Sequence, residues 1–491
     1  MSMVKTRFAP SPTGYLHIGG LRTALYNYLF AKKHGGIFAL RIEDTDRNRY
    51  VPGAVESLLH VLEAMGLQHD EGPILTKEGL IEQKGSLGPY IQSERLSLYT
   101  KYAHELLERG LAYECFCSSE RLESVRSQQG IAKLPTKYDR HCVTLSPEER
   151  TIKHTAGEPC VIRLKIPDGE TTFDDLIRGR ITIHNQEIDD QVLIKSDGFP
   201  TYHLANVIDD HLMEVTHVIR AEEWISSTPK HVLLYQAFEW DIPQFAHLPL
   251  ILNPDRSKLS KRQGDVAVED YLRKGYLPEA LINFVALLGF NPKADQELYR
   301  LEELAELFDI EKVNKSGAVF MTDKLDWMNG QYIRTKTPEE ITKLSQPFLK
   351  KAEIKAPEEI LIKICTVEKE RLVLLSDLVE KTRGYLILPT YQANLLVWKK
   401  STKEDARLQL QNIIPVLEGF NNEITGSSAL IEMALREYIE EKYLQNGNVL
   451  WPLRVALSGL SASPAPFELL WVLGKEESLR RIHKAITMLE E

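Results

Sequence analysis

The sequence predicts an α/β protein whose parallel sheet is split by an insertion and followed by a long helical half. Strands and helices alternate over the N-terminal region, which is typical of a parallel sheet. A strand- and turn-rich stretch from about 112 to 195 then holds three cysteines, and the α/β pattern resumes after it. Beyond about residue 265 nearly every segment has helical periodicity, with breakers such as GNVLWP and SASPAP between segments.

The first elements follow from local patterns. Residues 5–10 (KTRFAP) read as a short strand, and residues 21–35 have the apolar periodicity of an amphipathic helix that ends at two glycines. Residues 36–44 (GIFALRIED) read as a buried strand that runs into carboxylates, and residues 54–67 as a second helix. Because parallel α/β sheets bind ligands at the carboxyl ends of their strands, we expect the functional site at that edge.

The same pattern returns at FPTYHLANVIDDH and THVIRAEEW, so the intervening stretch is predicted to be an insertion into one domain. The helical periodicity beyond it predicts a connecting region and an all-helical domain. The expected boundaries are 1–95 and 196–265 for the split domain, 96–195 for the insertion, 266–331 for the connection and 332–491 for the helical domain.

Composition excludes several classes of protein. The 491 residues are 43% hydrophobic and 26% charged, as in an ordinary globular protein of two or three domains. We see no signal peptide and no apolar run long enough to cross a membrane, and five cysteines fit a reduced compartment. These features predict a cytoplasmic protein without a membrane partner. The net charge of −10 leaves nucleic-acid binding open, because a local basic patch decides that question.

The stretch RFAPSPTGYLHIGG, residues 7–20, predicts an anion site. A strand, a glycine-rich turn and a helix N-terminus together offer free backbone N–H groups and a favourable helix dipole to a phosphate. Gly14, Gly19 and Gly20 would let the phosphate reach the backbone, and His17 could donate to it. The stretch matches neither the dinucleotide-binding GxGxxG pattern nor the P-loop. Taken alone, it is equally compatible with an ordinary capped turn.

A second polar stretch, PLILNPDRSKLSKRQGD, places Lys258, Ser260, Lys261 and Arg262 in a loop after an apolar strand. Lysines on a loop can follow a pyrophosphate as it leaves, because an ammonium on a flexible stem is an adjustable point charge. The alternative is a solvated basic turn.

Together the two stretches resemble the HIGH and KMSKS signatures of class I aminoacyl-tRNA synthetases, here as HIGG and KLSKR. RIEDTDRNRY, GPYIQSERLSLY, DGFPTYHLANVIDDH, VIRAEEW, LDWMNGQYIR and WPLRVALSG extend the resemblance to bacterial-type glutamyl-tRNA synthetases over the whole chain. The resemblance implies a split Rossmann-like catalytic domain, an inserted domain for the tRNA acceptor end, a connecting stem-contact region and a helical anticodon-binding half. The expected reaction activates L-glutamate with ATP and Mg²⁺ and charges tRNA-Glu, and we expect a monomer.

Rival readings are a glutamyl-queuosine tRNA synthetase, a glutaminyl-tRNA synthetase and a non-catalytic tRNA-binding paralogue. The first lacks an anticodon half, whereas this chain continues for about 160 residues past Tyr332. The second has β-barrels where this chain is predicted to be helical. Intact motif residues oppose the third. The motifs do not indicate whether tRNA-Gln is also charged.

The resemblance also implies roles for single residues. His17, Lys258 and Lys261 would be catalytic, because they would hold the phosphates of ATP and the leaving pyrophosphate. The ATP site would also include Gly14, Gly19, Gly20, Ser260 and, against the adenine, Leu250 and Ile251.

Glutamate carries two carboxylates and one ammonium, so its pocket needs two arginines and an acid. Arg7 and Arg220 are the candidates for the side-chain carboxylate, since planar guanidinium groups match it bidentately, and Tyr202 could add a hydroxyl. Glu43 would bind the ammonium, helped by Ser11 and the backbone near Ala9. Asn206, four residues after Tyr202 on one helical face, could reach the α-carboxylate.

Three clustered cysteines, Cys115, Cys117 and Cys142, predict one structural Zn²⁺ that needs a fourth ligand. The C-x-H ending of some related sites is absent. Tyr138 precedes Cys142 by four residues, as in the C-x-C…Y-x-x-x-C arrangement of glutamyl-queuosine synthetases, and His141 is the rival ligand. The alternative is that the thiols are free. Cys160 and Cys365 look like small core residues.

Overall fold

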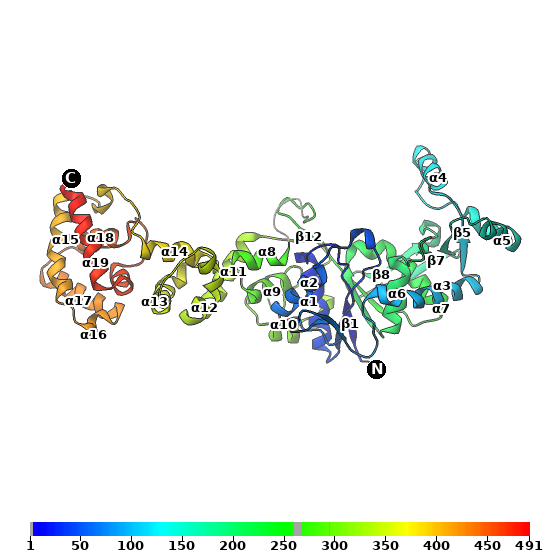
Figure 1. Cartoon of the computed structure of the whole chain (residues 1–491), viewed down its shortest axis with the longest axis horizontal. Coiled ribbons are helices and arrows are strands. Elements are labelled where there is room, and N and C mark those ends of the chain that lie inside the picture. The colour runs from blue at the N-terminus through cyan, green and yellow to red at the C-terminus, as the bar shows by residue number, and fades with distance from the viewer. Residues whose placement is uncertain (1–2, 260–266, 294) are drawn as a thin grey trace. The chain divides into compact units, whose positions relative to one another are not determined.

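The computed structural model describes residues 3–259, 267–293 and 295–491, and it divides into two compact units. The first unit comprises Met1–Tyr271 and Leu281–Thr322, and the second comprises Leu272–Ala280 and Asp323–Glu491. In Figure 1 the first unit is coloured mainly blue to green and the second yellow to red.

A six-stranded sheet forms the centre of the first unit. Its order is β2-β1-β10-β11-β7-β8, with all neighbours parallel except the β7–β8 hairpin. The strands are β1 (Lys5–Phe8), β2 (Ile37–Leu40), β7 (Glu170–Asp175), β8 (Gly179–His184), β10 (His217–Ala221) and β11 (Gln244–Leu248). The inner strands are buried on both faces, as parallel strands are when helices cover them. Because β1 lies between β2 and β10, segments about 200 residues apart in the chain share one sheet.

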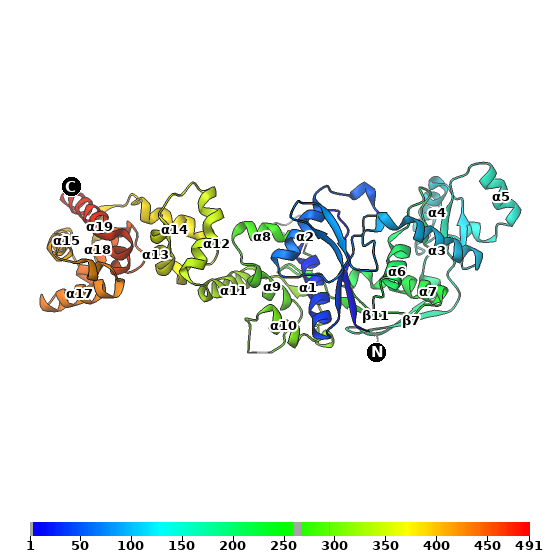
Figure 2. The same ribbon diagram turned by 60° about the horizontal axis from the view of Figure 1, so that its bottom comes forward.

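The helices of this unit follow the predicted order. α1 (Ile18–Lys33) and α2 (Ala54–Ala64) confirm the two N-terminal helices, and β1 and β2 confirm the two strands. α6 (Tyr202–Leu212) and α7 (Thr228–Phe238) lie side by side in both views (Figures 1 and 2). The α/β fold that the sequence predicts is confirmed here.

The stretch between the two halves of the sheet has its own small sheet, in the order β5-β6-β9. Its strands are β5 (Ala112–Cys115), β6 (Val161–Leu164) and β9 (Val192–Ile194), and its helices are α3 (Leu96–Glu108), α4 (Ser119–Ile131) and α5 (Pro147–Thr155). The β7–β8 hairpin falls inside the predicted insertion, yet it joins the edge of the six-stranded sheet through Phe245 and Asp175. The chain therefore returns to the large sheet once before the second half begins. The insertion boundaries stay a prediction.

Two short pairs of strands and three helices complete the elements before residue 322. The pairs are β3 (Gly72–Leu75) with β4 (Ile81–Lys84) and β12 (Ile251–Leu252) with β13 (Ala318–Val319). The helices are α8 (Val268–Lys274), α9 (Pro278–Ala286) and α10 (Leu301–Leu307).

The second unit is helical, as its periodicity predicts (Figure 2). Local signals start several of its helices: Thr337 with Glu340, and Thr402 with Asp405, form reciprocal capping boxes. Leucine and isoleucine side chains dominate its core. Its helices are α11 (Thr322–Thr335), α12 (Pro338–Lys351), α13 (Glu358–Glu368), α14 (Asp377–Leu386), α15 (Lys403–Glu418), α16 (Asn422–Thr425), α17 (Ser428–Glu441), α18 (Asn446–Ser458) and α19 (Pro466–Glu490). Among the residues described, we find no helix with the length and apolarity needed to cross a membrane.

Candidate active site

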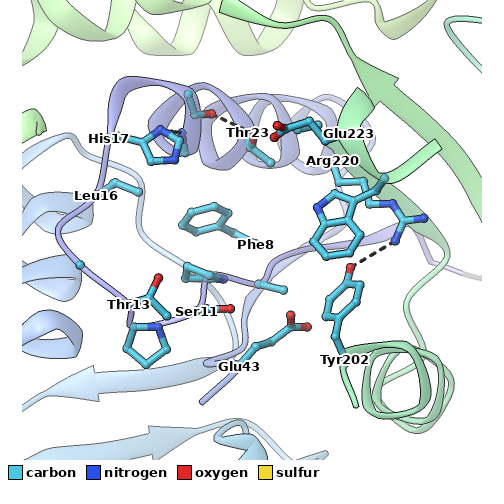
Figure 3. Close-up of a pocket in the computed structure, with 18 of the residues that line it drawn as sticks. Phe8, Ser11, Thr13, Leu16, His17, Thr23, Glu43, Tyr202, Arg220 and Glu223 are labelled. Carbon is cyan, nitrogen blue, oxygen red and sulfur yellow. Dashed lines mark hydrogen bonds between the residues drawn. The ribbon is translucent and has the colours of Figure 1, made fainter. Parts of the chain in front are cut away.

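A cavity of about 1050 Å³ opens at the carboxyl ends of the central strands. Figure 3 shows His17 at one end of it and Arg220 with Tyr202 at the other. Thirteen of the sixteen residues predicted for the ATP and glutamate sites line it: Arg7, Ala9, Ser11, Gly14, His17, Gly19, Gly20, Glu43, Tyr202, Arg220, Leu250, Ile251 and Lys258. Asn206 is buried and does not line it, and Ser260 and Lys261 lie outside the described residues.

His17 caps the N-terminus of α1. Its Nδ1 accepts from the backbone N–H of Gly20 at 3.1 Å, which requires an unprotonated Nδ1. The remaining ring nitrogen, Nε2, therefore carries the proton, and the side chain is exposed on the cavity. This tautomer makes His17 a hydrogen-bond donor toward an anion at the helix N-terminus.

The two glycines of this turn are required by close packing. A Cβ on Gly19 would lie 3.0 Å from the His17 ring, and a Cβ on Gly20 would lie 2.7 Å from the side chain of Leu16. A side chain at Gly19 would press on the His17 ring, and one at Gly20 would force the Leu16 side chain to move. The glycines therefore preserve both the donor and the approach to the backbone.

The loop lysine Lys258 forms an ion pair with Glu223, another residue of the cavity lining. Both side chains are about half exposed, so the pair is weak and a stronger anion can replace the carboxylate. Figure 3 shows Glu223 near the same side of the cavity as Thr23 of α1.

Backbone groups of Leu250 and Ile251 already form hydrogen bonds with other parts of the protein. The N–H of Leu250 donates to Glu222 at 2.8 Å, and its carbonyl accepts from Ala318 at 3.0 Å. The carbonyl of Ile251 accepts from Leu259 at 3.0 Å. The segment is thereby fixed as one wall of the cavity.

Arg7 belongs to a buried network of charges. Its Nε donates to Asp210 at 2.9 Å, and Arg41 donates to the same oxygen at 2.7 Å. Asn206 accepts from both arginines at 3.2 Å through Oδ1, so its amide nitrogen is the group that could donate to a substrate carboxylate. Burial opposes ionisation of Asp210, but Arg7 and Arg41 outweigh it and lower the pKa of that carboxyl.

Glu43 lies beside this network, three residues beyond the end of β2. Its carboxylate accepts from Arg41 at 2.9 Å, and it lies within the cavity lining with Ser11 (Figure 3). Burial raises the pKa of Glu43 to about 7, although Arg41 and Arg7 oppose the shift. An ammonium in the cavity would favour the ionised form.

Arg220 has a different environment from Arg7. Its guanidinium donates to Tyr202 at 3.2 Å, to Thr228 at 2.9 Å and to His247 at 3.1 Å, and lies 3.1 Å from Nδ1 of His231. All of these partners are neutral or can be neutral. Arg220 is only 5% exposed. In the part of the chain that the structure describes, no carboxylate forms an ion pair with it. A buried guanidinium without a carboxylate is a site for an anionic ligand.

Comparisons with known proteins identify the family. The family described as "tRNA synthetases class I (E and Q), catalytic domain" matches residues 3–327, and "Anticodon binding domain" matches residues 340–486. A glutamate–tRNA ligase of Chloroherpeton thalassium is 48% identical over 99% of this chain and 98% of its own, and one of Clostridium botulinum is 47% identical over 99% of both. The chain belongs to the glutamate–tRNA ligase family.

Solved structures of this family have the same fold. A glutamate tRNA ligase of Elizabethkingia meningosepticum, crystallised in complex with its amino acid, superimposes with a TM-score of 0.89 at 37% identity. The match covers 99% of this chain and 100% of that one. The fold class predicted from the sequence, a class I synthetase catalytic domain with an anticodon-binding helical half, is confirmed.

Trp224 is a residue of the cavity that sequence reasoning missed. Its indole lies 4.1 Å from the Tyr202 ring, centroid to centroid, and the Arg220 guanidinium lies 5.9 Å from its centroid. Trp224 is the last residue of the VIRAEEW motif, and this motif is the sequence feature that could have indicated a residue of the site here. Nothing local in that motif indicates that the ring covers Arg220.

The three cysteines of the insertion also come together. The Sγ atoms of Cys115, Cys117 and Cys142 lie within 4.8 Å of one another, and the Tyr138 hydroxyl lies 3.3 Å from two of them, those of Cys115 and Cys117. His141 is exposed and is absent from this group. The geometry therefore favours Tyr138 over His141 as the fourth ligand.

Charges near the cluster suit a metal with anionic ligands. The Arg163 guanidinium lies 4.1 Å from the Tyr138 ring centroid, and Arg121 lies 3.5 Å from the sulfur of Cys117. Burial raises the pKa of Cys117 to about 12. Burial also opposes ionisation of Cys115, but its hydrogen bonds with Tyr138, the Cys117 backbone and Arg163 outweigh burial and lower the pKa of Cys115. Three thiolates and a phenolate around Zn²⁺ would carry a net charge of about −2, which Arg163 offsets in part; Arg121 contributes less, because it is paired with Asp139. The residues fit a structural zinc ion.

Proposed function

We propose that the cavity joins L-glutamate to ATP as glutamyl-adenylate and then passes the glutamyl group to the 3′-terminal ribose of tRNA-Glu. The whole-length similarity to glutamate–tRNA ligases supports this reaction over a glutamyl-queuosine synthetase or a non-catalytic paralogue. The anticodon-binding match at residues 340–486 supports tRNA as the partner. We expect the chain to act as a monomer.

The observation that carries the assignment of the substrate is the environment of Arg220. A buried cation with only neutral partners prefers a ligand that brings a negative charge. The side-chain carboxylate of glutamate supplies it, and the amide of glutamine does not. Tyr202 donates to the same carboxylate oxygen or its neighbour, and Trp224 shields the pair from water.

The rest of the amino acid would bind between Arg220 and the turn before α1. Glu43 receives the ammonium together with Ser11 and the carbonyl of Ala9. Asn206 would donate its amide to the α-carboxylate, although it is buried and does not line the cavity in the structure. Arg7, whose charge Asp210 balances, adds a positive potential near both carboxylates.

The other end of the cavity would hold ATP. Activation requires in-line attack of the α-carboxylate oxygen on the α-phosphorus, with pyrophosphate as the leaving group. His17 donates to the phosphates, and the turn that contains Gly14, Gly19 and Gly20 lets them approach the backbone, although the N–H of Gly20 itself is donated to His17. Lys258, with Ser260 and Lys261 from the loop outside the described residues, stabilises the charge on pyrophosphate. The adenine packs against Leu250 and Ile251. Mg²⁺ arrives with the nucleotide and is held mostly by phosphate oxygens and water.

A structural Zn²⁺ would occupy the cluster of Cys115, Cys117, Tyr138 and Cys142. A four-coordinate site of protein ligands leaves no position for a reactive water, so the ion stabilises the insertion and takes no part in the chemistry.

The test is ATP–pyrophosphate exchange in the presence of tRNA-Glu, with glutamate and with glutamine, for the wild type and Arg220→Ala. The wild type should strongly prefer glutamate, and the variant should lose most of that preference because the cation that directly contacts the side-chain group is gone. Losing one partner of a buried charge pair costs about 3–5 kcal/mol. Equal losses for the two amino acids would show that Arg220 does not bind the side chain.

A further inference from the structure

Arg220 contacts two chains of polar residues, all of them buried except the half-buried His203. In the first, Nε of Arg220 donates to Nε2 of His247 at 3.1 Å, and Nδ1 of His247 lies 2.6 Å from Oδ2 of Asp175. In the second, Nδ1 of His231 faces the guanidinium and its Nε2 lies 3.0 Å from Nδ1 of His203. His247 and His231 are fully buried.

The hydrogen bonds allow only one tautomer of His247. The Nε of an arginine always carries a hydrogen, so Nε2 of His247 must accept and cannot carry a proton. The single proton of the neutral ring then lies on Nδ1 and is donated to Asp175. Asp175 therefore selects the tautomer that can accept from Arg220.

The charges around His247 agree with a neutral ring. Asp175, Arg220 and Arg178 are the charged groups that face it, and Phe245 stacks on it with a centroid distance of 6.2 Å. Burial lowers the pKa of His247, and the two arginines lower it further, while Asp175 opposes them. A protonated ring would place a second cation against Arg220.

Asp175 also has a structural role that can be separated from this one. Its Oδ1 accepts from the backbone N–H groups of Ile177 at 3.0 Å and Arg178 at 2.8 Å, in the turn between β7 and β8. Its Oδ2 faces His247. The two oxygens thus serve different partners, which allows one function to be changed without the other.

We propose that Asp175 and His247 are positioning residues for Arg220 and that they determine how strongly the enzyme prefers glutamate over glutamine. The proposal rests on the proposed function, in which Arg220 binds the glutamate side chain. Through His247, Asp175 fixes the plane of the guanidinium, so that its Nη1 edge is aimed with Tyr202 into the cavity.

The decisive variant is Asp175→Asn. The asparagine oxygen can still accept from Ile177 and Arg178, whereas its amide now donates to Nδ1 of His247. The proton of the ring then moves to Nε2, where it meets the N–H of Arg220, donor against donor. Oγ1 of Thr228, 3.1 Å from Nε2, can accept this proton, but the hydrogen bond from Nε of Arg220 is lost. We expect the KM for glutamate to rise about 10- to 100-fold and the glutamate-to-glutamine ratio of kcat/KM to fall by a similar factor, while the KM for ATP stays unchanged. An unchanged ratio in a folded Asp175→Asn protein would overturn the proposal.

His247→Gln provides the second test, because a glutamine oxygen can accept from Arg220 without help from Asp175. This variant should keep the amino-acid preference within about threefold, and Asp175→Asn should then cause no further loss of preference in the double variant. Additive losses would instead mean that Asp175 acts only on the fold. Thermal unfolding of each variant shows whether it is folded. If the single variant Asp175→Asn does not fold, the comparison of His247→Gln with the double variant decides the question.

Two further variants separate the possible failures. Asp190→Asn is the matched control, because Asp190 is equally buried but contacts Tyr113 and Arg140 and has no contact with Arg220. Its amino-acid preference should equal that of the wild type. If Arg220→Ala keeps the preference, the proposed function fails; if Arg220→Ala loses it and Asp175→Asn keeps it, only the positioning role fails.

Discussion

Arg7 and Asp210 form a buried ion pair with 2.9 Å between Nε and Oδ1, and they are joined across about 200 residues of sequence. Arg41 shares the same carboxylate oxygen at 2.7 Å. Arg220 lies on the neighbouring strand. Among the described residues, all of its hydrogen-bond partners are neutral or can be neutral. Two arginines that were predicted to play the same role thus lie in opposite electrostatic environments.

Matched substitutions should separate these environments. Arg7→Met leaves Asp210 with one arginine fewer, which costs about 3 kcal/mol and should lower the thermal unfolding midpoint by about 5 °C or more. Arg220→Met removes a cation that forms no ion pair with a carboxylate among the described residues but does hydrogen-bond to neutral groups, so the midpoint should fall less than in Arg7→Met while the preference for glutamate is lost. Calorimetry and amino-acid-dependent exchange measure the two effects. A larger loss of stability in Arg220→Met than in Arg7→Met would contradict this account.

The raised pKa of Glu43 predicts a pH dependence of glutamate binding. Only the ionised carboxylate attracts the substrate ammonium, and burial raises the pKa to about 7. The kcat/KM for glutamate should therefore rise between pH 6 and pH 8 with a midpoint near 7, and Glu43→Gln should remove this step. The effect on stability has the opposite sign, because the pKa of Glu43 in the folded protein lies above its ordinary value of 4.5. The contribution of Glu43 to the free energy of unfolding is therefore complete below pH 4.5 and is lost as the pH rises through 7. A wild-type profile that matches the Glu43→Gln profile would exclude Glu43 as the ammonium site.

The part of the site that local patterns predict is the turn before α1, whereas distant lining residues such as Arg7 and Tyr202 were predicted from the family resemblance. His17, Gly19 and Gly20 lie in one turn, and a capped helix N-terminus is a local pattern. The neutral environment of Arg220 could not be predicted, because its partners come from α6, α7 and β11, which only the fold brings together. The return of β7 and β8 to the large sheet could not be predicted either, because the alternating pattern of a strand does not indicate which sheet it joins.

The loop lysine predicts an effect on rate rather than on binding. Lys258→Ala should lower the rate of activation about 10²- to 10³-fold if the ammonium stabilises the leaving pyrophosphate, with little change in the KM for glutamate. Arg256→Ala, which removes a cation from the same exposed turn, is the control and should have a small effect. From the sequence we expect the same loss for Lys261→Ala. Full turnover in both lysine variants would refute the role of the loop.

The thiol cluster predicts about one zinc per chain in the purified protein. Cys117→Ser and Tyr138→Phe should lower zinc content or affinity and loosen the insertion, as shown by faster proteolysis between residues 96 and 195, before ATP binding is affected. His141→Ala is the control, because His141 is exposed and lies outside the cluster. A metal-free wild type with full charging activity would exclude a structural zinc.

The last prediction concerns the order of events. The family resemblance implies that activation of glutamate waits for tRNA, and a physical reason is available. The acceptor end must reach the cavity beside the phosphates at His17, whereas the match to an anticodon-binding domain lies at residues 340–486. Binding energy from those remote contacts can then hold ATP in its reactive position, which raises the rate of a step in which the anticodon itself takes no part.

This coupling can be measured in the full-length chain. ATP–pyrophosphate exchange with glutamate should be slow without tRNA-Glu and rise by at least about tenfold when it is added. Because tRNA contacts are mainly to phosphates, activation as well as transfer should weaken as salt rises. Titrating tRNA-Glu and tRNA-Gln side by side also shows which of the two the helical half accepts. The tRNA stripped of its 3′-terminal adenosine is the control, since it keeps the anticodon contacts and lacks the end that enters the cavity. Equal exchange rates with and without tRNA would mean that the two halves of the chain act independently in the activation step.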